Sequence, residues 1–173
     1  MTAAANTDDR GELLRKAARW LGEAQDAVAQ SQWGDAETAL SLAESAYGAA
    51  RDSDPSADAD PDEDEMLSEG AALCTLLRSD IALRHWQLGE AETHLDAAYQ
   101  VLKQGEGLGV ELWRLTGRLA ERRGRWTSAY AAWKKVAKTM EGKDERKLAD
   151  AWIRLSEIAL IQGKQKVAQD MLI

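Results

Sequence analysis

The sequence returns four times to a glycine at the same place in a helix-turn-helix pattern, and this recurrence most constrains the fold. The four glycines lie 55, 35 and 39 residues apart, at Gly34, Gly89, Gly124 and Gly163. These distances bracket the period of about 34 residues that is typical of helical-hairpin repeats once loop insertions are allowed. Glycine readily takes the left-handed conformation that closes a helix. The pattern therefore predicts that each glycine ends a first helix and opens the turn into a second.

Small and aromatic residues recur at matched distances from these glycines. An alanine stands five residues after the glycine in three of the four units, at Ala39, Ala129 and Ala168. A small side chain at this place allows one helix to approach its neighbour closely. The third unit carries the fullest pattern: Trp113, Thr116, Gly117 and Ala120 before Gly124, then Ala129, Trp133 and Val136 after it. The fourth unit carries Trp152, Leu155, Ser156 and Ala159 before Gly163.

These residues resemble the tetratricopeptide repeat family, whose pattern has Trp-x2-Leu-Gly-x2-Tyr on the first helix and small and aromatic residues on the second. The resemblance implies an all-α fold, a right-handed solenoid of about four helical hairpins of which the last is short. It also implies that the first helices line a concave groove. The first two units match less well, with Glu23 and Ala27 in one and Arg78 and Ala82 in the other where tryptophan and glycine are expected.

The 173 residues suit a single domain that covers the whole chain, 1–173. Within it we expect repeat 1 over 9–51, with Asp9 as its N-cap, and an acidic flexible loop over 52–65. The further expected units are repeat 2 over 66–104, repeat 3 over 108–141 and a truncated repeat 4 over 144–173.

The net charge of −8 comes from the expected loop alone. Eight acidic residues and no basic residue lie between Asp52 and Glu65, which leaves 22 acidic and 22 basic residues elsewhere. Two prolines and the lack of apolar periodicity indicate a segment that does not order itself. The segment is either a solubilising insertion or an acidic stretch that engages a basic partner or the groove of this same chain.

Three arginines recur every four residues in the third unit, at Arg114, Arg118 and Arg122, which places them on one helix face. On the family resemblance this face points into the groove, where Arg154 extends it and Trp86 adds an apolar contact. Arginine forks suit carboxylates and phosphates, so we expect these five residues to bind a partner peptide, with an acidic one as the natural ligand. An ordinary solvated helix face is the alternative interpretation.

The residues that chemistry usually requires are missing from the sequence. His85 and His94 are not at a metal-ligand spacing, Cys74 has no histidine within a helical turn, and no catalytic or phosphate-loop motif occurs. We therefore expect no enzyme activity, no metal and no cofactor. A pI near 4.9 disfavours nucleic acid, and no segment approaches the roughly 20 apolar residues of a membrane span. A single cysteine favours the reducing cytoplasm.

The sequence thus predicts a non-catalytic scaffold that docks a protein or peptide partner in a concave groove. Two alternatives stay open. In the first alternative, the chain is a self-assembly or structural module, a homo-oligomer that pairs through the apolar edge Met171–Ile173. In the other alternative, it is a regulatory sensor region of a larger signalling or transcription protein, in which the segment 52–65 competes for the groove.

Overall fold

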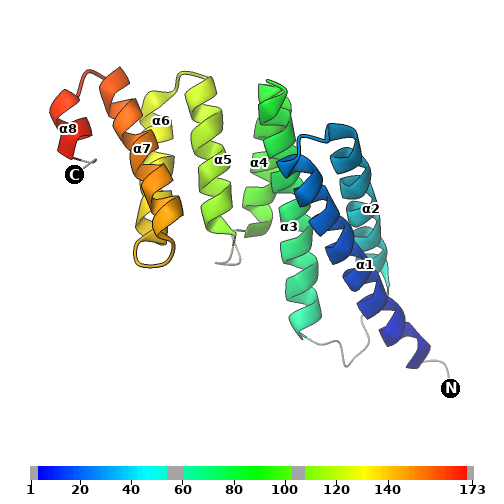
Figure 1. Cartoon of the computed structure of the whole chain (residues 1–173). Helices are drawn as coiled ribbons and strands as arrows, with labels where there is room; N and C mark the ends of the chain where they lie inside the picture. The colour runs from blue at the N-terminus through cyan, green and yellow to red at the C-terminus, as the bar shows by residue number, and fades with distance from the viewer. Residues whose placement is uncertain (1–3, 54–60, 103–107, 171–173) are drawn as a thin grey trace.

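The computed structural model describes residues 4–53, 61–102 and 108–170, and this part of the chain folds into eight α-helices without a strand (Figure 1). The all-α class predicted from the sequence is confirmed for these residues. The helices are α1 (Ala4–Ala29), α2 (Trp33–Asp52), α3 (Pro61–Arg84), α4 (Leu88–Leu102), α5 (Gly109–Arg122), α6 (Trp126–Met140), α7 (Glu145–Ile161) and α8 (Gln165–Asp170).

The helices stand in a row that follows their order in the chain, from α1 at one end to α8 at the other (Figure 1). Each helix packs against the next one, and in addition α1 contacts α3 and α3 contacts α5. The odd-numbered helices therefore form a layer of their own at this end of the row. The layer is interrupted once, because the Cα atoms of α5 and α7 in the described chain come no closer than 8 Å to each other.

The same turn joins the two helices of every pair. Its central residue has a left-handed backbone, with φ of 60° at Ser31, 61° at Trp86, 67° at Gly124 and 75° at Gly163. The N–H of the next residue donates to the carbonyl oxygen five positions earlier, at N–O distances of 2.8, 2.9, 2.8 and 2.8 Å. This is the Schellman arrangement, which satisfies carbonyl groups that the helix end leaves without a partner.

The prediction that Gly34 and Gly89 form these turns is wrong, because both lie in the first turn of the second helix, three residues after the left-handed residue. The residue that all four pairs share is instead an alanine five positions after the turn. It is at most 2% exposed in every pair, since it lies where the two helices meet. The four alanines are Ala36, Ala91, Ala129 and Ala168.

Counting from the left-handed residue instead of from Gly34 or Gly89 shifts the alignment of the first two helix pairs by three residues. Trp20, and not Glu23, now takes the place of Trp113 and Trp152, eleven residues before the turn. A buried small residue stands seven residues before the turn in every pair, namely Ala24, Ser79, Gly117 and Ser156. Close packing explains the small size, because a Cβ atom on Gly117 would lie 2.8 Å from Nε1 of Trp133 on the partner helix.

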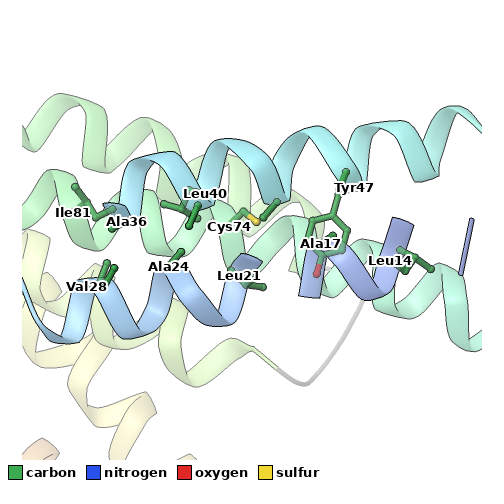
Figure 2. Packing of buried hydrophobic residues seen from close by; sticks show 14 of the residues in the cluster. Leu14, Ala17, Leu21, Ala24, Val28, Ala36, Leu40, Tyr47, Cys74 and Ile81 are labelled. Carbon is green, nitrogen blue, oxygen red and sulfur yellow. The ribbon is translucent and has the colours of Figure 1, made fainter. Parts of the chain in front are cut away.

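Three apolar clusters follow one another along the row. The first joins α1, α2 and α3, and Figure 2 shows Leu21, Leu40 and Cys74 close together between these helices, with Leu14 further along α1. The second joins α3, α4 and α5 around Leu83, and the third joins α5, α6 and α7. Full burial of one leucine side chain contributes roughly 1.5 to 3 kcal/mol. Each cluster shares a helix with the next, so packing propagates from neighbour to neighbour.

The expected acidic loop over 52–65 is shorter than predicted, because α2 extends to Asp52 and α3 already begins at Pro61. Proline suits the first position of a helix, where its missing N–H has no partner to lose. Acidic residues in the first turn, at 62–64, face the positive end of the helix dipole. Arg10 on α1 further holds this turn through Glu63, at 3.8 Å, and Asp64. Residues 54–60 lie outside the described part.

The N-terminal helix starts before the expected beginning of repeat 1. The first helix begins at Ala4 instead of at Asp9, since the alanine-rich stretch before Asp9 favours helix. The side chain of Asp144 caps α7 by accepting a hydrogen bond from the backbone N–H of Lys147 at 3.0 Å. The apolar edge Met171–Ile173 lies outside the described residues.

Candidate functional site

The three arginines of α5 lie on one face of that helix, as their spacing predicts. Arg118 reaches back to α3, where its Nη1 donates to Oδ1 of Asp80 at 2.7 Å. Arg114 and Arg118 also line a groove that extends towards α7. The arginine row, which we define as Arg114, Arg118 and Arg122, therefore occupies the surface formed by α3, α5 and α7.

Asp80 is the resident counter-ion of this surface, and it is only 5% exposed. Its second oxygen accepts a hydrogen bond from Nε of Arg84 at 3.2 Å, so one carboxylate serves two arginines. A buried carboxylate requires such partners to offset the loss of hydration. Burial lowers the pKa of Arg118, and the positive charges of its arginine neighbours add to this effect, while Asp80 opposes it.

Two further arginines of the predicted site are paired with acids on their own helices. Arg114 donates from Nε to Oε2 of Glu111 at 2.8 Å. Burial alone would lower the pKa of Arg114, but this hydrogen bond and the charge of Glu111 raise it. Arg154 pairs with Glu157 at 3.1 Å on the exposed surface of α7. An acidic ligand must therefore compete with internal carboxylates at both positions.

Arg122 differs from the rest of the row because it makes no ion pair or hydrogen bond with any residue in the described part of the chain. Its guanidinium group lies over the ring of Trp86, 4.2 Å from the ring centroid. Trp86 does not stand on the first helix, as the sequence suggested, but in the turn between α3 and α4, where its side chain is 67% exposed. The structure thus brings two of the predicted site residues into direct contact.

A groove of about 970 Å³ lies between α5 and α7, where the layer of odd-numbered helices is interrupted. Its floor comes from α6 and is mainly apolar, with Trp133, Val136 and Met140. Ile153, which is 46% exposed, adds an apolar side chain to the wall formed by α7. The charged residues of the two walls are Glu111, Arg114 and Arg118 on α5 and Asp144, Arg146, Lys147, Asp150, Arg154 and Glu157 on α7 and its cap. Most of these charges are paired within one helix, so the floor is the distinctive part of the groove.

A hydrogen bond fixes the aromatic residue of the groove floor. Nε1 of Trp133 donates to Glu121 on α5, and the indole ring packs against Gly117. Burial raises the pKa of Glu121, although the hydrogen bond from Trp133 and the charge of Arg154 oppose the shift. The ring is therefore held in one orientation from two sides.

The opposite side of α5 carries a second and smaller pocket of about 240 Å³, lined by α4, α5 and α6. Trp113 stands in it, with Nζ of Lys135 3.4 Å above the ring and Tyr99 edge-on at a centroid distance of 6.3 Å. No separate sequence signal indicated this pocket, because aromatic residues at helical spacing are typical of an ordinary core.

Comparison with family models, curated proteins and solved structures finds no significant match to this chain. The tetratricopeptide resemblance therefore rests on the residues of this chain alone. Among the described residues, no group of three or more histidine, cysteine or acidic side chains is arranged to hold a metal ion. None of the helices described here combines the length and the apolar character that crossing a membrane requires.

Proposed function

We propose that this chain is a non-catalytic protein-interaction module built from four tetratricopeptide-like hairpins stacked into a right-handed solenoid. Three features recur in every pair and support the proposal: the left-handed turn, the buried alanine after it and the small residue before it. In such an arrangement each pair buries its apolar face against the next. The surface of the odd-numbered helices is then the concave one.

The partner we propose is a peptide segment of another protein, docked between α5 and α7. The groove of about 970 Å³ with its apolar floor carries this proposal. Pockets of this size with apolar floors and a few polar groups at the rim are typical of binding sites. Because the helices are already ordered, the ligand bears most of the entropic cost of binding. Apolar side chains of the peptide contact the floor, and its acidic side chains face Arg114, Arg118 and Arg154.

The docking proposal is tested by selecting peptides from a random display library on the full chain and measuring their affinity for two variants. Ile153→Glu places a charge in the groove, and we expect binding to weaken about tenfold or more because an apolar contact is lost and a charge is desolvated. Ile161→Glu is the matched control, since Ile161 is 56% exposed on the same helix and does not line the groove. Equal loss in both variants, or a library that yields no binder, would overturn the proposal.

A self-assembling module is the second candidate function, and one observation favours it. Large apolar side chains are exposed on the last helix pair outside the groove, where no other part of the described chain covers them. They are Leu160, Ile161 and Val167, at 52%, 56% and 41% exposure. Analytical ultracentrifugation tests the idea: a self-associating chain becomes monomeric in Ile161→Glu, and a wild type that is monomeric at high concentration excludes it.

A further inference from the structure

Three arginines, Arg84, Arg118 and Arg122, lie near the ends of α3 and α5, and the carboxylate of Asp80 pairs with the first two of them. Arg84 and Arg118 each use a single nitrogen on Asp80, at 3.2 and 2.7 Å, while Arg122 has no acidic partner within the described chain. Burial is the main cause of the lowered pKa of Arg118, and the charges of Arg84 and Arg122 both contribute, so each of these two groups lies within electrostatic reach of Arg118. Three guanidinium groups against one carboxylate leave a surplus of two positive charges.

Arg122 is the member of this group whose hydrogen-bonding capacity is unused. Its Nη1 atom is covered and has no acceptor, and none of its five N–H donors is bonded to a described residue. A covered donor without an acceptor destabilises the folded chain, because the hydration that it loses is not replaced. An oxyanion at the edge of the guanidinium group would supply the missing acceptors and the missing negative charge together.

Trp86 orients Arg122 through its ring, and its own backbone has an unfavourable conformation. A bulky residue with φ of 61° is unusual, because the left-handed conformation brings the Cβ atom of an L-residue too close to the following carbonyl oxygen. The equivalent turns at Gly124 and Gly163 use glycine and so avoid this close approach. Backbone strain of this kind concentrates at binding sites. Here the strained turn carries an exposed ring that fixes the plane of the Arg122 guanidinium before a ligand arrives.

We propose that Arg84, Arg118 and Arg122, with Trp86 as the orienting ring, bind a doubly charged oxyanion group of the docked peptide. The group is a phosphoryl group or a pair of neighbouring carboxylates, both of which match the surplus of two charges and the fork geometry of arginine. The inference rests on the docking function proposed above and adds the chemistry of the ligand. It adds a site for an acidic group at the end of α3 to the arginines that line the groove beside α7.

Small anions test this site without a peptide. In the full chain labelled with ¹⁵N, the arginine Nε–Hε signals are followed while inorganic phosphate, malonate or acetate is added at neutral pH and constant ionic strength. We expect a saturable shift of the Arg122 and Arg118 signals with phosphate, with malonate or with both, and weaker binding of the singly charged acetate. The dianion that binds more tightly identifies the source as phosphoryl or as paired carboxylates.

Variants separate the site from general electrostatic attraction. Arg122→Gln should weaken dianion binding about tenfold or more, because charge-assisted hydrogen bonds are lost. Arg51→Gln removes the same charge from the exposed end of α2 and should leave binding unchanged. Trp86→Gly, which retains the turn, should also weaken binding.

Two results would overturn the inference: no saturable shift with either dianion, or equal weakening in Arg122→Gln and Arg51→Gln. Loss of peptide binding in the groove with intact dianion binding refutes the docking function alone. The reverse result refutes this anion site alone.

Discussion

Close contacts at single residues set the limits of substitution in this chain, and two glycines show this most clearly. A Cβ atom on Gly70 of α3 would lie 2.1 Å from Cζ of Tyr47 on α2, a distance that real Cβ atoms do not reach. Tyr47 itself is only 5% exposed, so its ring has little room to move. Nothing lies within 4 Å of the corresponding position on Gly48, although this glycine also stands inside a helix. A side chain at Gly70 would therefore clash with Tyr47, whereas there is room for one at Gly48.

We predict that Gly70→Ala destabilises the protein by about 1 to 3 kcal/mol, because the added methyl group displaces the Tyr47 ring. Gly48→Ala is the control and should stabilise the protein by roughly 0.5 to 1 kcal/mol, since alanine loses less backbone entropy in a helix. Urea unfolding followed by circular dichroism measures both changes. Equal stability of the two variants would show that the contact with Tyr47 is not as tight as described.

At the scale of the helix, α5 connects the candidate site to the core, because its faces serve different partners. One face presents the arginine row, and another packs Gly117 against Trp133 and accepts the indole N–H through Glu121. The periodicity of the sequence was sufficient to predict the shared face of the three arginines. It was insufficient to identify Asp80 and Glu111 as their partners, since acidic residues are common and only the packing of α3 against α5 brings Asp80 to Arg118.

Glu121 makes this helix sensitive to pH. Its pKa in the folded chain is raised above the ordinary value of 4.5, chiefly by burial, so the folded state retains a proton that the unfolded state releases. The free energy of unfolding must then decrease as the pH rises from about 4.5 through the raised pKa. Glu121→Gln removes this decrease and still offers an oxygen to Trp133.

Urea unfolding between pH 4 and 7 tests this prediction. We expect the stability of Glu121→Gln relative to the wild type to increase with pH across this range. Glu37→Gln, at an exposed position of α2, provides the comparison and should show no such trend. A difference between Glu121→Gln and the wild type that stays constant with pH would contradict the assignment.

The positions of the turns show how far the sequence alone could lead. The all-helical class followed from periodicity, and the recurring glycines led to the expectation of about four helix pairs. The register of the first two pairs did not follow, because Ser31 and Trp86 adopt the left-handed conformation that was assigned to glycine. In these pairs a Schellman turn formed by non-glycine residues precedes a glycine inside the helix, and a pattern based on residue type cannot distinguish the two.

At the scale of the whole molecule, stability is distributed over three clusters in series. Cys74 reports on the first one, since burial raises the pKa of its thiol to about 12 and leaves almost no reactive thiolate near neutral pH. Alkylation must therefore wait for this cluster to open. Because contacts in the described chain run only between helices one or two places apart in the row, we expect a disturbance at the far end to reach Cys74 weakly.

Leu14→Ala and Leu155→Ala form a matched pair for this prediction, at 2% and 1% exposure in the first and third clusters. Each should cost about 2 to 5 kcal/mol of local stability. We expect Leu14→Ala to accelerate alkylation of Cys74 under native conditions by a larger factor than Leu155→Ala. Equal acceleration, measured by mass spectrometry over time, would show that the molecule opens as one cooperative unit.

The wide separation of the α5 and α7 backbones has a mechanical consequence. Within the described chain, the backbone of the last helix pair packs closely against α6 alone, so a tilt of α7 and α8 relative to α5 would change the width of the groove. A bound segment that contacts both walls would restrict this tilt. Binding in the groove would then reduce the mobility of α8 at the far end of the row.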